Sequence, residues 1–173
     1  MVEGIIASQN KAEATAYDDM ILCLGLKKTI ESYSGNCITV RRASDNTTQD
    51  IGFVGNDLDT AFLETFCSGT DGFVTKWFDQ SGNGRYAEQL TNSLQPKIVT
   101  AGSTILKDGL PAISSDGVDD VMDIVNGDFT FGDEFSFFMV LAYKVKGTEQ
   151  RIYSYQTIDQ DLTTLLFLEN LEQ

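Results

Sequence analysis

A strand-to-loop junction at residues 77–86 gathers the side chains best suited to holding a sugar. Its aromatic residues supply flat apolar faces, and its amide and carboxylate groups can hydrogen-bond to hydroxyl groups. The candidate carbohydrate-binding residues are Trp77, Phe78, Asp79, Gln80, Asn83 and Tyr86. The same composition also suits a loop in which Trp77 belongs to the core and the polar side chains bond the loop's own backbone. The sequence leaves both interpretations open.

A second group of residues offers hard oxygen ligands for a cation. Residues 108–143 contain no lysine or arginine, and Asp116, Asp119 and Asp120 lie close together within them. Carboxylates of this kind bind Ca²⁺, so these three are the candidate metal ligands, and no other cofactor is predicted. Val118 stands where an EF-hand loop needs an acid, so that motif is absent. A solvated acidic face beside turns is the other interpretation.

Other familiar chemistries are disfavoured or excluded by the residues present. Residues 82–87 fit the glycine pattern of a dinucleotide site, but Pro96 follows too soon for the helix that such a site requires. The chain has no histidine, which excludes Ser-His-Asp and Cys-His catalysis and imidazole metal ligands. Three cysteines, Cys23, Cys37 and Cys67, are few and odd in number, which indicates buried small side chains rather than a disulfide framework.

Short strands separated by turns must position these groups. Residues 73–78 are aromatic and β-branched, which is typical of a strand. Strict alternation would place Phe73, Thr75 and Trp77 on one face and Val74, Lys76 and Phe78 on the other. Lys76 predicts that the second face meets water or an acidic partner. Further short strands are predicted at residues 37–42, 51–54, 97–101 and 104–106, with the strongest core strand at 135–143. This spacing predicts an antiparallel β-sandwich.

Two helical segments accompany the predicted strands. Apolar residues recur at four-residue steps within residues 10–31, which predicts a helical N-terminal segment over residues 1–31 before a sandwich domain over residues 32–173. A short helix is predicted at residues 58–66, capped by Asn56 or Asp57. Its apolar face would consist of Leu58, Ala61, Phe62 and Phe66.

The sequence Trp77-Phe78-Asp79-Gln80-Ser81-Gly82-Asn83-Gly84 resembles the YDQSGNG segment of fungal-type α-L-arabinofuranosidase catalytic domains. The likeness extends to residues 32–35, 40–47 and 65–67. The order RRASDN, DIGFVG and WFDQSGNG looks closer still to uncharacterised LamG-like modules of phage and marine bacterial proteins. Across roughly residues 26–120, this resemblance implies an all-β fold, a concanavalin-like antiparallel β-sandwich (jelly roll) with a helical N-terminal segment and one short helix.

The resemblance to glycosidases directs attention to pairs of acids. A retaining mechanism needs two carboxyl groups about 5 Å apart. Asp79, Glu88, Asp133 and Glu134 are candidates, but their spacing singles out no pair. The family's catalytic acids lie C-terminal to the matching region, so no catalytic residue is predicted. The resemblance also implies a cysteine partner for Cys67 five residues later, where this chain has Gly72. That bridge cannot form here, which suggests folding under reducing conditions.

The net charge and the two ends of the chain bear on the partners that the protein can have. Twelve basic and 26 acidic residues give a net charge of −14, which disfavours nucleic-acid and anionic-membrane partners. No leader is visible at the N-terminus, and no apolar run reaches the roughly 18 residues of a membrane span. The last fifteen or so residues begin an element that a neighbouring subunit would complete, which predicts a homo-oligomer.

These features together predict a non-enzymatic structural or adhesion module of a phage particle surface, such as a capsid decoration or a tail or fibre accessory protein. Such a protein would be located in the virion and would contact copies of itself or other virion proteins. Two alternatives are a carbohydrate-binding module, for which a glycan is the partner, and an arabinofuranosidase-like glycoside hydrolase. Either alternative would be secreted.

Overall fold

The computed structural model describes residues 20–126, 139, 140, 142, 151–154 and 165–167, and the following account concerns these residues. The chain divides into two compact units, Met1–Phe135 and Ser136–Gln173. In the second unit, β12 (Arg151–Ser154) pairs antiparallel with β13 (Leu165–Phe167). Most of the predicted strand at residues 135–143 lies outside the described residues, as do Asp133, Glu134 and most of the predicted intersubunit segment. The described residues Met139 and Val140 are exposed and belong to no strand, so the prediction of a core strand is wrong at these two positions.

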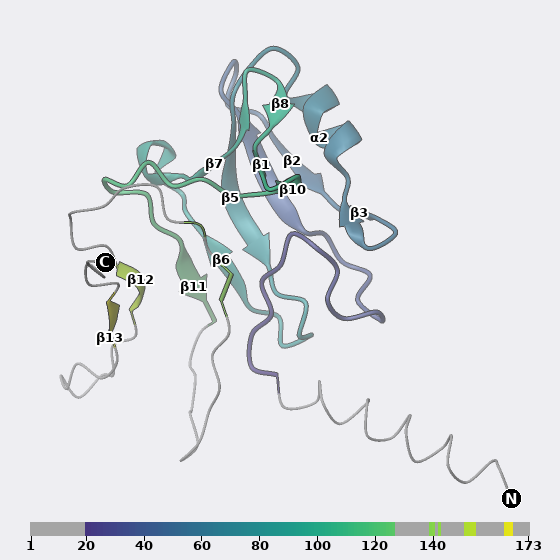
Figure 1. The fold of residues 1–173 in the computed structure, drawn as a ribbon, viewed down its shortest axis with the longest axis vertical. Helices are drawn as coiled ribbons and strands as arrows, with labels where there is room; N and C mark the ends of the chain where they lie inside the picture. Colours follow the sequence, from purple (N-terminus) through teal and green to yellow (C-terminus); the bar gives the residue numbers. More distant parts are fainter. Residues whose placement is uncertain (1–19, 127–138, 141, 143–150, 155–164, 168–173) are drawn as a thin grey trace, which may run out of the picture. The chain divides into compact units, whose positions relative to one another are not determined.

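The described residues of the first unit form short strands and one short α-helix (Figure 1). Its elements are β1 (Ile38–Arg42), β2 (Thr48–Ile51), β3 (Phe53–Val54), β4 (Asp57–Leu58), α2 (Thr60–Phe66), β5 (Gly72–Phe78), β6 (Tyr86–Glu88), the 3-10 helix η1 (Asn92–Leu94), β7 (Lys97–Thr100), β8 (Ser103–Thr104), β9 (Leu106–Lys107), β10 (Leu110–Pro111) and β11 (Asp123–Val125). Every strand pairing in the described part of this unit is antiparallel. The prediction of an all-β antiparallel fold with one short helix is confirmed.

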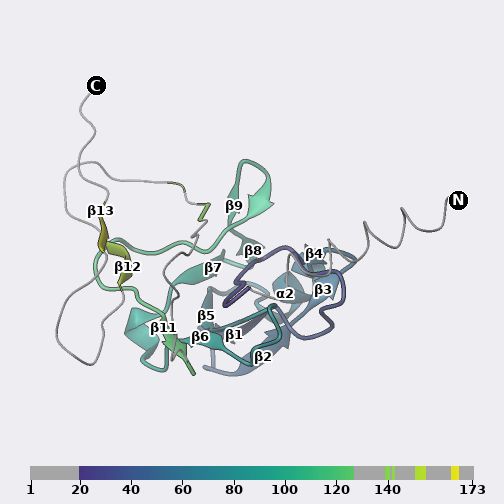
Figure 2. The same ribbon diagram turned by 90° about the horizontal axis from the view of Figure 1, so that it is seen from below.

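A seven-stranded sheet organises this unit, with β5 at its centre. The main path runs in the order β11-β6-β5-β1-β2, and β7 joins β5 and carries β8. Figure 2 shows β6, β5, β1 and β2 side by side. The predicted strands at residues 73–78 and 97–101 correspond to β5 and β7. The predicted turn at Asp108 and Gly109 joins β9 to β10, with positive φ at both residues.

One face of the sheet packs against α2 and the β3–β4 hairpin to form the core. Ile51, Ile38, Trp77 and Ala87 are directly paired across β2, β1, β5 and β6, so their side chains share this face. The fully enclosed apolar cluster consists of Cys37, Ile38, Val40, Ile51, Leu58, Leu63, Cys67, Val74, Ile98 and Val99. Leu26, Phe53, Phe66, Trp77, Ile113 and Met122 pack around it.

A β-bulge in β5 changes which side chains reach this core. Thr39 pairs with Lys76 and Val40 pairs with Val74, so Thr75 is an extra residue opposite β1. As a result Val74 and Trp77, three positions apart, both contact the core. The prediction that they lie on opposite faces is therefore wrong, because strict alternation holds only where the ladder is regular.

The short helix starts later than predicted. Its N-cap is Asp59, whose carboxylate accepts a hydrogen bond from the Phe62 N–H at 2.9 Å, so the predicted caps, Asn56 and Asp57, are wrong. Leu58 belongs to β4, and the buried helix residue is Leu63, while Phe62 is 43% exposed. The apolar face of the helix is therefore displaced from the predicted one.

The segment before β1 is not helical where it is described. Residues 20–31 form bends, turns and isolated bridges, including Leu24 with Asp79 and Lys27 with Asp57. The predicted helix therefore does not extend through these residues, because their backbone bonds are made with the sheet and its loops. Residues 1–19 lie outside the described part, and the predicted domain boundary at residue 32 stays a prediction.

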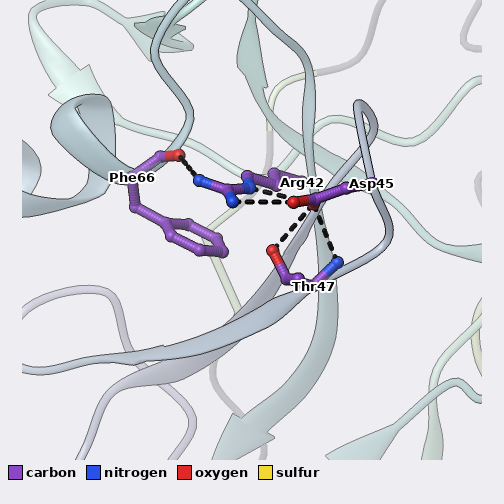
Figure 3. Close-up of polar contacts among 4 residues, drawn as sticks. All are labelled: Arg42, Asp45, Thr47 and Phe66. Carbon is purple, nitrogen blue, oxygen red and sulfur yellow. Dashed lines mark hydrogen bonds and ion pairs between the residues drawn. The ribbon is translucent and has the colours of Figure 1, made fainter.

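The turn between β1 and β2 is braced by an arginine fork (Figure 3). Arg42 donates from Nε and Nη2 to the two carboxylate oxygens of Asp45, at 2.9 and 2.7 Å. Its Nη1 donates to the carbonyl of Phe66, the last residue of α2, at 3.3 Å. Asp45 also accepts from the N–H and hydroxyl of Thr47. One guanidinium therefore joins the turn to the helix end.

Candidate functional site

The loop at residues 79–85 holds the segment before β1 against the sheet. The Asp79 Oδ1 atom accepts hydrogen bonds from the Cys23 N–H at 2.7 Å and from the Ser81 N–H at 2.9 Å. Asp79 is 5% exposed, and its other carboxylate oxygen accepts from the Ser81 hydroxyl. This carboxylate is committed to groups of the protein itself.

Gln80 makes the same kind of connection more completely. Its Oε1 accepts from the Thr29 N–H at 2.8 Å, and its Nε2 donates to the carbonyls of Gly25 and Lys27, both at 3.0 Å. The side chain is 2% exposed. Burial of an amide is tolerated here because both its oxygen and its NH₂ group are bonded.

Asn83 and Arg85 extend this network at the edge of the loop. Asn83 donates from Nδ2 to the carbonyls of Met20 and Ile21, and Arg85 donates from Nη1 to the carbonyl of Ile21. Trp77 lies on the core side of the sheet. Four of the predicted carbohydrate-binding residues, Trp77, Asp79, Gln80 and Asn83, therefore have structural contacts in this fold.

The other two predicted sugar ligands come together on the opposite face of the sheet, which we call the open face. Phe78 and Tyr86 are directly paired across β5 and β6. The Lys76 Nζ atom lies 4.1 Å from the centroid of the Tyr86 ring and 5.8 Å from that of Phe78. It also lies 3.4 Å from Glu88 Oε1. The prediction that Lys76 faces water or an acidic partner is confirmed.

A single row of polar side chains crosses the open face. It is defined by direct pairing of neighbours, so its members project to the same side of the sheet. From β2 to β11 the row consists of Asp50, Thr39, Lys76, Glu88 and Asp123. The Thr39 hydroxyl donates to Asp50 Oδ1 at 2.6 Å, and the Asn36 amide donates to Asp50 Oδ2 at 2.9 Å.

This row crosses a hollow of about 370 Å³, which we call the open-face groove. Its lining residues are Thr39, Thr48, Asp50, Thr75, Lys76, Phe78, Glu88, Gln89, Leu90 and Gln95. Gln89 and Gln95 are buried, and Gln95 accepts from Arg41 Nε at 2.7 Å while donating to the Gln89 carbonyl at 2.9 Å. The groove therefore combines one aromatic wall with fixed hydrogen-bonding groups.

Sequence reasoning missed most of this groove. Thr39, Asp50 and Glu88 are unremarkable when taken singly, because strand pairing rather than sequence distance brings them together. The available signal was the alternation of polar and apolar residues in residues 37–42 and the position of Lys76. Neither pattern gives the register, which depends on the bulge at Thr75.

The three candidate metal ligands are close together in the structure. Carboxylate oxygens of Asp116, Asp119 and Asp120 all lie within 4.8 Å of one another. The Asp116 N–H donates to Asp120 Oδ2 at 2.7 Å, and the Val118 N–H donates to Asp116 Oδ1 at 2.8 Å. The Val118 N–H lowers the pKa of Asp116, whereas burial raises the pKa of Asp120. The donor set suits Ca²⁺, and binding of that ion stays a prediction.

None of the helices in the described residues has the length and apolar composition required to cross a bilayer.

Comparison with known proteins identifies relatives of residues 25–115, which match the family described as "Alpha-L-arabinofuranosidase B, catalytic". Over 61 residues the chain is 38% identical to α-L-arabinofuranosidase B of Penicillium canescens, covering 34% of this chain and 13% of that protein. Over 60 residues it is 40% identical to "Probable alpha-L-arabinofuranosidase B" of Aspergillus fumigatus, covering 34% and 12%.

A solved structure is also similar to part of the chain. It is a GH54 α-L-arabinofuranosidase soaked with a cyclic sulfate inhibitor, 32% identical, with a TM-score of 0.40. The match covers 43% of this chain and 16% of that one. The chain spans about an eighth of the length of the two curated relatives.

These matches correct three predictions. A non-enzymatic module of a phage particle surface is the wrong main interpretation, since the relatives are named as glycoside-cleaving enzymes. The expectation that the chain is not an enzyme and the virion assignment are wrong for the same reason. The resemblance of residues 77–84 to arabinofuranosidases is confirmed. It is a better guide to function than the features of the N-terminus and of the last fifteen or so residues.

Proposed function

The chain belongs to the family of the α-L-arabinofuranosidase B catalytic domain, and from this membership we propose that it serves in the hydrolysis of α-L-arabinofuranosides. The observation that carries the proposal is the family match over residues 25–115. That range contains β1 to β10, and therefore most of the central sheet. The match covers only 13% and 12% of the length of the two curated relatives, so their activity and substrate are part of the proposal for this chain.

The chemistry of glycoside cleavage limits which described acids could act. One carboxyl group must protonate the leaving oxygen, and a second must attack the sugar or activate water. Asp79 is unsuited to either role because both of its oxygens are bonded to Cys23 and Ser81. Glu88 lies on the open face, where it is paired with Lys76. No catalytic role is assigned to either residue.

The same family membership bears on where the protein acts. A polysaccharide substrate is met outside cells, so the secreted alternative suits the proposed activity. The likeness to LamG-like modules of phage and marine bacteria stays a prediction, as does a homo-oligomeric state, and neither is needed for the proposed activity.

The test is release of 4-nitrophenol from 4-nitrophenyl α-L-arabinofuranoside by the purified protein. Release above a buffer blank is expected, with 4-nitrophenyl β-D-xylopyranoside as the matched glycoside that should be cleaved far more slowly. A single carboxylate-to-amide substitution that abolishes release without changing the thermal midpoint would identify a catalytic acid. Equal, buffer-level signals from both glycosides would contradict the proposal.

A further inference from the structure

The open-face groove contains a charge pattern that is fixed by strand pairing. Along the row, Asp50 and Glu88 carry negative charges and Lys76 carries the positive charge between them. The Lys76 ammonium lies between the Glu88 carboxylate and the Tyr86 ring. A cation held against an aromatic face and a carboxylate has little rotational freedom, so its remaining N–H bonds are directed.

The groove presents hydrogen-bonding groups of both kinds beside an aromatic surface. Lys76 is a donor, Asp50 and Glu88 are acceptors, and the Thr48 hydroxyl is both, whereas the Thr39 hydroxyl already donates its proton to Asp50. Phe78 supplies an apolar wall. A sugar has the matching chemistry, since its hydroxyls both donate and accept while its C–H faces pack on aromatic rings. The volume of about 370 Å³ falls at the lower end of small-molecule sites.

Charge selects the kind of glycan. Two carboxylates in the groove and a net charge of −14 repel polyanions such as nucleic acid or polyuronate. A neutral oligosaccharide is not repelled, and it can use the carboxylates as acceptors for hydroxyl groups.

We propose that the open-face groove is a binding site for a neutral oligosaccharide, which is held by hydrogen bonds to Lys76, Asp50 and Glu88 and by packing on Phe78. The inference rests on the proposed function in one respect, because it assigns the groove to the glycan chain that carries the arabinofuranosyl unit. Binding in the groove requires no catalytic group, so it can be measured separately from hydrolysis.

The experiment is isothermal titration of the whole chain with arabinohexaose and xylohexaose, with hexagalacturonate as the anionic comparison. At least one neutral hexasaccharide is expected to bind, and hexagalacturonate at least tenfold more weakly. Lys76→Met and Phe78→Ala are expected to raise Kd at least tenfold. Lys107→Met, which removes a lysine from β9 outside the groove, should leave Kd within twofold.

Backbone amide shifts keep the test decisive if one variant folds poorly. In the unaltered protein, the titration should shift the amides of Thr39 and Lys76 more than those of Leu63. Absence of neutral-glycan binding, or binding that both Lys76→Met and Phe78→Ala leave unchanged, overturns the proposal. Shifts at Lys76 that follow protein concentration instead of sugar would indicate a second copy in the groove and also overturn it.

Hydrolysis and binding fail independently in this design. Groove-dependent binding without release of 4-nitrophenol removes the proposed activity and leaves the groove assignment standing. Release of 4-nitrophenol without groove-dependent binding removes the groove assignment and leaves the proposed activity standing.

Discussion

Gly72 faces Cys67 so closely that a Cβ atom added to Gly72 would lie 2.7 Å from the Cys67 Sγ. These are the two positions at which the resemblance to the fungal enzymes implies a disulfide. The geometry shows that the fold keeps the two positions adjacent, although this chain has only one of the two sulfur atoms. Val40 and Val99 approach the same point, both at 3.1 Å.

Gly72→Cys is therefore expected to form a disulfide with Cys67 under oxidising conditions. Closing so short a loop should make the oxidised variant more stable than its reduced form by about 2 kcal/mol. Thiol titration in denaturant and urea unfolding would measure the two effects. Gly72→Ala adds the Cβ without the disulfide bond. It should lower the free energy of unfolding by about 2 kcal/mol, because the added Cβ crowds Cys67, Val40 and Val99. If every cysteine of oxidised Gly72→Cys still titrates as a free thiol, the inferred adjacency is wrong.

Gln80→Glu tests how the 79–85 loop holds residues 25–29. The substitution removes the NH₂ group that donates to the Gly25 and Lys27 carbonyls and places a carboxylate oxygen against them. A loss of about 3 kcal/mol in the free energy of unfolding is expected at pH 7, because the site is buried. The loss should shrink at acidic pH, where the introduced carboxyl group is protonated and regains one donor. Gln49→Glu, at a partly exposed residue whose amide donates to the Asp50 carbonyl, should change stability by less than about 0.5 kcal/mol.

Asp45 should contribute to the loss of stability in acid. Its pKa lies well below its ordinary value, chiefly because Arg42 donates to the carboxylate and secondarily because of Thr47. A lowered pKa in the folded state means that the contribution is present above the unfolded value, near 3.9, and is lost as pH falls through the folded value. Asp45→Asn is therefore expected to flatten the decline of the urea midpoint between about pH 5 and pH 2.

The partner of Asp45 supplies the control for that measurement. In an Arg42→Gln background, Asp45→Asn should have a smaller effect on the acid decline, because the arginine fork is already absent. An equal effect in both backgrounds would mean that Arg42 does not cause the pKa shift.

Leu63→Ala and Phe62→Ala separate the observed helix register from the predicted one. Leu63 is 0% exposed, so truncating it to alanine should lower the free energy of unfolding by about 3 kcal/mol. Phe62 is partly exposed, and its truncation should cost less than about 1 kcal/mol. Chemical unfolding of the two variants gives the comparison directly. A larger loss for Phe62→Ala would support the predicted face and contradict the observed one.

The sequence was sufficient for features that depend on local chemistry. The aromatic and β-branched residues of β5 predict its strand, and the Asp108-Gly109 pair predicts the turn between β9 and β10. The fold class follows from many short strands of this kind. These features depend on backbone preferences that neighbouring residues determine.

Features that depend on distant partners could not be predicted. The bulge at Thr75 arises from pairing with β1, and it turns both Val74 and Trp77 toward the core. Asp79 and Gln80 have the composition of a ligand site, yet residues 23–29 occupy their bonding groups. A polar loop and a binding loop have the same composition, and only the position of the other segment distinguishes them.

The unequal exposure of the three thiols gives the protein a natural attachment point for a reporter group. Cys37 and Cys67 are enclosed, and burial raises the pKa of Cys37 to about 12, so alkylating reagents will reach them only after unfolding. Cys23 is only partly buried, and its backbone N–H is bonded to Asp79. Burial also raises the pKa of Cys23, so a fluorophore added at mildly alkaline pH would couple there slowly but selectively. Its emission would then report when residues 20–29 detach from the sheet.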